Sequence, residues 1–276
     1  MNNLKHLLSL SVSTKSKRYY TAFNLIVTTS ALVILGFTQL TFAAEKLSLA
    51  THSALIQKLE SVVSNNDRDT MYKQSQLALR LADLYAERAR LLSLENEGKG
   101  DALYKDKINS DRSQAIQIYG KILSTLKAEE KGRVLLQTAH LHLMMQNQPA
   151  AVQVYSGIIK NRKIHTPETL ATAQIQMGDI LFYKGEFEKA YQLFSSSLAI
   201  KQNPRKGYAL YRSAWCQFNI GQTKFAQTKL ITLLKNKPLF VKSKTRVLDV
   251  SFQEEVSRDL ATFMARNGIN SNDITT

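Results

Sequence analysis

The side chains that could do chemistry in this chain are few and poorly spaced. His140 and His142 lie two residues apart and would point to diverging sides of a helix, whereas helical metal ligands lie four apart. His52 and His165 have no carboxylate or cysteine at a useful spacing. The chain shows neither a glycine-rich phosphate loop nor a Gly-x-Ser-x-Gly elbow. We therefore expect no catalytic, metal or cofactor site, and a protein that is not an enzyme.

The single cysteine, Cys216, is the remaining candidate nucleophile. It lies beside Trp215 in a helical pattern, where a free cysteine is typically a small buried hydrophobe. With one thiol the chain forms no internal disulfide, so its apolar core must hold it together. We predict a structural role for Cys216, with a free catalytic thiol as the alternative.

The composition indicates a helical globular protein. Of 276 residues, 44% are hydrophobic and 21% are charged, close to the globular average. Only 4 prolines and 11 glycines are present, which is few for a β-protein with many turns. We predict an all-α fold.

The first residues read as an export signal. No acidic residue precedes Glu45, and residues 23–40 form an uncharged apolar run that ends in Thr41-Phe42-Ala43-Ala44. This is the layout of a secretory signal peptide, residues 1–43, with cleavage after Ala43. The alternative is an uncleaved anchor in the inner membrane, because the run is barely long enough to span a bilayer. Either way the folded part is expected outside the cytoplasm, in a bacterial periplasm.

The charge balance is strongly basic. The formal net charge is +15, and removal of residues 1–43 takes away four basic and no acidic residues, which leaves +11. Anionic lipid or cell-wall polymer and acidic proteins are the expected counterparts, with a merely solvated surface as the alternative. No dense Lys/Arg block with interleaved aromatic residues predicts nucleic-acid binding.

A second pattern concerns packing. An alanine followed four positions later by a large residue recurs at intervals of 36, 39 and 36 residues. The pairs are Ala115 with Tyr119, Ala151 with Tyr155, Ala190 with Phe194, and Ala226 with Leu230. A period of this length is typical of repeat arrays.

Each period predicts two amphipathic helices and a tight turn. The clearest unit has helices at 167–184 and 187–200, a turn at Gly185 and an end at Asn203-Pro204. The next has helices at 206–220 and up to 235, with a turn at Gly221. We expect Gly178 and Ala190 where the first two helices cross, and Phe194 between that pair and the next.

These residues resemble the tetratricopeptide repeat, a helix–turn–helix unit. One copy carries Gly178, Leu181, Ala190 and Phe194, and a second carries Ala214, Gly221, Ala226 and Leu230. Residues 132–160 resemble a degenerate third copy, with Ala139 and Ile158 but Gln146-Asn147-Gln148-Pro149 in place of the turn glycine. The resemblance implies a right-handed helical-hairpin solenoid, an interaction module in the bacterial envelope, with a concave binding groove.

The chain around these repeats is less regular. We expect irregular helical repeats over 46–128, tetratricopeptide-like repeats over 129–236, and a capping helix with a tail over 237–276. In the first part, Asp111 is expected to cap a helix, and Arg88 interrupts an apolar stripe, so that its charge must reach past that stripe to water.

The most suggestive face lies between Tyr208 and Phe218. Tyr208, Tyr211, Trp215 and Phe218 share one side of a helix, and the resemblance places them in the concave groove beside Arg212 and Asn219. The preceding repeat presents Ile175, Asp179 and Phe182 at equivalent positions. Aromatic residues and arginine dominate binding hot spots, so we expect a partner-binding groove here, with a plain core face as the alternative.

The expected function is a non-catalytic scaffold that binds another envelope protein or peptide. The alternatives are the recognition part of a cell-wall-acting enzyme complex and a binder of anionic envelope polymer.

Overall fold

The computed structural model describes residues 48–65, 71–97, 101–241, 245 and 247–266. The expected signal peptide, residues 1–43, lies outside these ranges. From Ser48 onward the chain belongs to one unit. No helix in the described ranges combines the length and the apolar character that a bilayer span requires.

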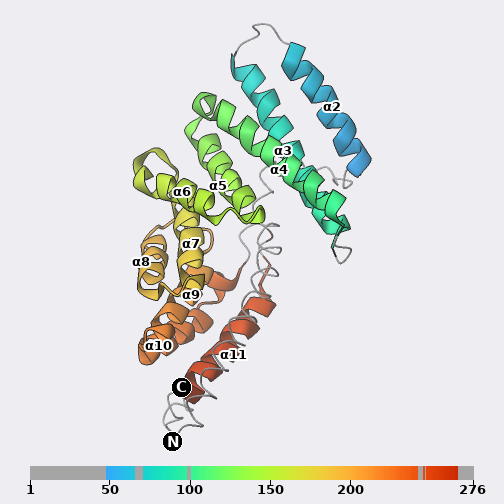
Figure 1. The fold of residues 1–276 in the computed structure, drawn as a ribbon. Helices are drawn as coiled ribbons and strands as arrows, with labels where there is room; N and C mark the ends of the chain where they lie inside the picture. Colours follow the sequence, from blue (N-terminus) through green and yellow to red (C-terminus); the bar gives the residue numbers. More distant parts are fainter. Residues whose placement is uncertain (1–47, 66–70, 98–100, 242–244, 246, 267–276) are drawn as a thin grey trace, which may run out of the picture. The chain divides into compact units, whose positions relative to one another are not determined.

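The all-α prediction is confirmed. The described residues form ten α-helices and three short 3-10 helices, and their only β-type pairing is an isolated bridge between Val241 and Leu248 (Figure 1). The α-helices are α2 (Leu49–Asn65), α3 (Met71–Glu95), α4 (Ala102–Ile122), α5 (Ala128–Met144), α6 (Gln148–Lys160), α7 (Pro167–Tyr183), α8 (Phe187–Leu198), α9 (Lys206–Asn219), α10 (Thr223–Lys235) and α11 (Val250–Arg266). The 3-10 helices are η1 (Leu123–Thr125), η2 (Arg162–Ile164) and η3 (Lys237–Phe240).

Tight turns join the helices of the last three hairpins, α5–α6, α7–α8 and α9–α10. Gly185 and Gly221 take left-handed backbone conformations, with φ of 81° and 83°. The α5–α6 hairpin, which lacks a turn glycine, also has a left-handed residue at the corresponding point, because Gln146 adopts φ of 59°. A turn this short makes the two helices of a hairpin antiparallel neighbours.

The residues of the repeating pattern are buried at the helix contacts. Ala115, Ala151, Ala190 and Ala226 lie on α4, α6, α8 and α10, and all are 0% exposed. Their partners Tyr119, Tyr155, Phe194 and Leu230 are at most 2% exposed. Each consecutive pair of helices from α2 to α11 is in contact, so the arrangement is solenoid-like.

Glycines mark the closest approaches. A Cβ added at Gly178 on α7 would lie 2.9 Å from the ring of Phe194 on α8. On α5, a Cβ at Gly132 would lie 2.5 Å from the hydroxyl of Thr169, so the first turns of α5 and α7 touch. Helices α5 and α7 therefore begin at the same edge of the array.

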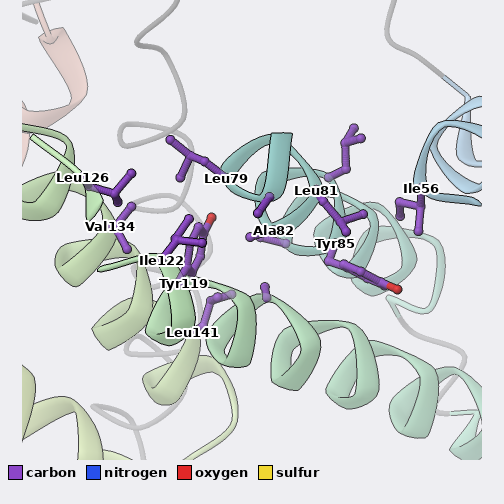
Figure 2. Packing of buried hydrophobic residues seen from close by; sticks show 14 residues of the cluster. Ile56, Leu79, Leu81, Ala82, Tyr85, Tyr119, Ile122, Leu126, Val134 and Leu141 are labelled. Atoms are coloured by element: carbon purple, nitrogen blue, oxygen red, sulfur yellow. The ribbon is translucent and has the colours of Figure 1, made fainter. Parts of the chain in front are cut away.

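The amino-terminal core joins four helices. Ile56 on α2, Tyr85 on α3, Tyr119 on α4 and Val134 on α5 are buried in one continuous cluster (Figure 2). This cluster integrates the irregular first part of the chain with the first of the regular hairpins.

Two local predictions in this region are wrong. Helix α4 begins at Ala102, where Asp101 caps it by accepting a hydrogen bond from the Leu103 amide, whereas Asp111 lies inside the helix. The Arg88 guanidinium does not extend past the stripe into solvent but binds the buried Asp111, and the Arg88 side chain is 13% exposed. Farther along, α8 ends at Leu198, before Asn203-Pro204, and the Asn203 side chain donates to the Ser197 carbonyl at the helix end.

Candidate functional site

Helix α11 covers a large part of the predicted groove face of α9. The Phe263 ring stacks on Phe218, with centroids 3.9 Å apart, and meets Trp215 edge-on at 4.9 Å. Phe252 meets Tyr211 edge-on at 5.4 Å. Tyr211, Trp215 and Phe218 thus form the seat of the capping helix.

Polar bonds fix the register of this seat. Asp259 on α11 accepts hydrogen bonds from the Tyr211 hydroxyl (2.5 Å) and the Trp215 indole nitrogen (2.8 Å). Glu255 accepts a second bond from Tyr211. Burial, and then the negative charges of Asp259 and Glu255, raise the pKa of Tyr211, so its hydroxyl remains a donor.

A second network joins α7 to α9. Asp179 accepts bonds from Tyr208 (3.0 Å) and from Arg212 Nε (2.8 Å). The Arg212 guanidinium also lies over the Phe182 ring, 3.9 Å from its centroid. Burial opposes the charge of Arg212, but Tyr208 and Asp179 raise its pKa overall. The polar groups expected to bind a partner are thus satisfied largely within the array.

The same chemistry recurs between α3, α4 and α5. Asp83 on α3 accepts from Tyr119 of α4 at 2.6 Å and from Arg133 of α5 at 3.3 Å. Asp83 follows Ala82 just as Asp179 follows Gly178, so both aspartates occupy the same repeat position. This small-residue–aspartate pair was a usable sequence signal that our predictions did not include.

A third network joins α2, α3 and α4. Arg88 donates two bonds to Asp111, both at 2.7 Å, and a longer one to Ser53 on α2. Tyr85 donates to Glu60 on α2, and burial followed by this bond raises the pKa of Tyr85 to about 12. Sequence reasoning missed these partners, because they lie more than twenty residues apart.

The networks connect helices and do not activate a nucleophile. Burial raises the pKa of the Cys216 thiol to about 12, which leaves it protonated and unreactive. Burial, together with Arg112, lowers the pKa of His140 to about 4. Across the described ranges, no group of three His, Cys, Asp or Glu side chains could hold a metal ion.

The remaining predicted residues divide between core and surface. Ile175, Gly178 and Ala214 are buried in helix contacts, whereas Asn219 is exposed and donates to the Trp215 carbonyl. Phe182 is partly exposed. Of the predicted groove residues, Tyr211 and Arg212 are buried and Asn219 is exposed. The others are partly exposed: Asp179, Phe182, Tyr208, Trp215 and Phe218.

An apolar groove that the sequence did not suggest lies between α2 and α3. It has a volume of about 390 Å³, and its apolar lining consists of leucine and valine side chains. Two exposed basic side chains, Lys58 and Arg80, stand at its rim. Its apolar lining residues are Leu55, Leu59, Val62, Leu77 and Leu84.

The position of this groove follows from the array. Helix α3 packs on α2 and α4, and none of the described helices pairs with α2 as a preceding hairpin partner. At the other end, α11 covers the corresponding helices α9 and α10. The two ends therefore differ, because none of the described helices packs over the groove beside α2.

No protein-family model matches this chain, and no curated protein matches it.

Proposed function

We propose that this chain is a non-catalytic scaffold of the bacterial envelope, built from tetratricopeptide-like hairpins in a right-handed array and exported by its first 43 residues. The observation that carries the proposal is the open α2–α3 groove. Helical-hairpin arrays act mainly by presenting apolar surfaces to other proteins. The internal polar networks hold the scaffold in shape.

The partner element that fits the groove is an amphipathic helix with acidic side chains beside its apolar face. Leucine and valine side chains at helical spacing on α2 and α3 match a helix packed in a groove. The charges of Lys58 and Arg80 favour carboxylates on the incoming helix and disfavour lysines. Because α11 covers much of the predicted concave face, we place the partner at the amino-terminal end of the array.

The test uses two synthetic helical peptides with the same leucine face, one flanked by glutamates and the other by lysines. Fluorescence anisotropy with the full chain should show the acidic peptide binding about three- to tenfold more tightly, as expected for two exposed charges. The double variant Lys58→Glu/Arg80→Glu should reverse the preference.

The groove itself is tested on α2. Val62→Glu, at a lining residue that is 37% exposed, should abolish binding of the acidic peptide. Ala54→Glu introduces the same side chain at an exposed position of the same helix that does not line the groove, and should leave apolar docking intact. Equal loss in both variants, or no binding of either peptide, would refute the proposed groove.

A further inference from the structure

One edge of the array carries positive charge with few carboxylates to compensate it. From Lys189 to Leu248 the sequence contains twelve Lys or Arg residues and no Asp or Glu. Two of the twelve form ion pairs within the array: Arg212 binds Asp179, and Lys189 binds Glu186. Among the others that the structure describes, five lie where one hairpin passes into the next: Lys201, Arg205, Lys206, Lys235 and Lys237.

These inter-hairpin connections lie at a common edge, because successive hairpins repeat the same antiparallel path. The first turns of α5 and α7 touch at Gly132 and Thr169. The start of α9 touches the connection after α10, where a Cβ at Gly207 would lie 2.2 Å from the Leu239 carbonyl oxygen. Nearer the amino terminus, Thr125 after α4 donates to Ser75 in the first turns of α3.

We call this edge the basic edge and define it as residues 160–166, 199–206, 235–241 and 247–250. Its first connection carries Lys160, Arg162 and Lys163, and all three are exposed. The second carries Lys201, Arg205 and Lys206. The third begins with Lys235 and Lys237.

Carboxylates are scarce along this edge. Asp249, which accepts from the Phe252 amide at the start of α11, is the only one within the defined residues, and Glu168 follows in the first turn of α7. By contrast, the hairpin turns at the other edge, residues 145–147, 184–186 and 220–222, balance Lys184 against Glu186. The positive charge is thus concentrated on one edge. Lysines near the carboxyl ends of helices interact favourably with the helix dipole, but this edge carries more basic residues than that effect explains.

The same edge exposes large apolar side chains. Ile164 is 63% exposed in the first connection, and Val247 and Val250 are 59% and 54% exposed in the third. Val241 and Leu248, paired in the isolated bridge, are also exposed. Apolar side chains among lysines are poorly suited to a soluble polyanion, but they suit the interface of a bilayer, where acyl chains and anionic head groups lie a few ångströms apart.

We propose that the basic edge docks the array onto an anionic lipid bilayer, with lysine and arginine on the head groups and Ile164, Val247 and Val250 in the interfacial layer. Each basic residue near an anionic surface attracts independently, so the three connections act together. A second copy of this chain is a poor occupant, because two basic edges repel each other. The proposal does not depend on the α2–α3 groove, which involves other residues.

The charge test is co-sedimentation of the full chain with phosphatidylethanolamine vesicles that contain or lack phosphatidylglycerol. The variant Arg162→Glu/Lys163→Glu/Lys201→Glu/Lys206→Glu should lose the phosphatidylglycerol-dependent binding by more than about tenfold. The control Lys105→Glu/Lys107→Glu/Lys184→Glu/Lys224→Glu changes the net charge equally at exposed residues off the edge, and should retain most of that binding. Equal losses would overturn the proposal. The amino-terminal segment is common to all samples.

The apolar test separates a bilayer from a soluble polyanion. Ile164→Ser/Val250→Ser should weaken binding to the anionic vesicles severalfold and leave binding to poly-L-glutamate unchanged. Leu103→Ser/Phe225→Ser, at exposed apolar residues off the edge, should change neither. If Ile164→Ser/Val250→Ser binds vesicles like the unmodified chain, the edge recognises polyanions and the bilayer proposal fails.

Discussion

Gly207 shows how a single residue sets the distance between two segments. A side chain there would meet a backbone carbonyl, that of Leu239, at 2.2 Å, and a backbone cannot rotate away as a side-chain tip can. Gly120 on α4, in contrast, is exposed and has no neighbour within 4 Å of an added Cβ. The two glycines thus have opposite roles in similar helical surroundings.

Alanine at these two positions should therefore change stability in opposite directions. We expect Gly207→Ala to lower the free energy of unfolding by about 1–3 kcal/mol, or more if η3 separates from α9. Gly120→Ala should raise it by about 0.5–1 kcal/mol through helix propensity. Urea denaturation of both variants measures the difference, and a loss at Gly207 no larger than the change at Gly120 would contradict the assigned contact.

The sequence predicted which residues pack in the core better than it predicted which residues form ion pairs. The alanine and aromatic ladder was visible because its spacing repeats, and each of those residues is buried. The pairing of Arg88 with Asp111 was not visible, because a salt bridge between helices leaves no periodic signal. Asp111 was therefore assigned to a helix start, a role that Asp101 fills.

At the scale of elements, α11 packs on the aromatic face of α9 and covers part of it. Trp215 is the only tryptophan, and it contacts both Phe263 and Asp259 of α11. Its fluorescence thus reports directly whether α11 is docked.

Truncating Phe263 should loosen this helix. We expect Phe263→Ala to destabilise the fold by about 3–5 kcal/mol and to shift Trp215 emission to longer wavelength, because water reaches the indole. Thr262→Ala alters the neighbouring exposed position and should leave the emission unchanged. A native-like emission in Phe263→Ala would show that α11 does not shield the tryptophan.

Sequence patterns could predict that 251–266 is helical but not where it docks. The helix carries an apolar stripe, and its two fully buried residues are Val256 and Phe263, both 0% exposed. The aromatic residues of α9 could face a partner or another helix of the same chain. The spacing of apolar residues within α9 does not distinguish the two, because it does not say where α11 packs. The predicted groove and the observed seat consequently share Tyr211, Trp215 and Phe218.

For the whole molecule, acid should weaken folding. The pKa of His140 falls from 6.5 to about 4 on folding because of burial and Arg112, so the unfolded chain holds more protons between these values. Stability is then complete above about pH 6.5 and decreases as the pH falls toward 4, by up to about 2–3 kcal/mol. Protonation also adds positive charge to a chain that already carries +15.

Burial also lowers the pKa of His142 and of His165, and a variant separates the contribution of His140 from theirs. Urea midpoints measured between pH 7 and pH 4.5 should decline more steeply for the unmodified chain than for His140→Phe, which cannot bind a proton. Identical slopes would mean that His140 is not desolvated in the fold.

The all-α class of the whole molecule was predictable, because amphipathic periods and scarce glycine and proline dictate it. The α2–α3 groove was not, because two helices form its walls and its exposure depends on which of the described helices lie beside them. Local sequence patterns indicate which face of a helix is apolar, but not which other element packs against that face.

The aspartates of α3 and α7 have a consequence for how such a chain can evolve. Asp83 pairs with Arg133, and Asp179 pairs with Arg212, so in these two cases the next unit supplies the counter-charge. Excising the α5–α6 unit would bring Thr172 of α7 to the place of Arg133, and Asp83 would lose its cation. We therefore expect removal of this unit to disturb its neighbour, so that the units of this chain are not freely interchangeable.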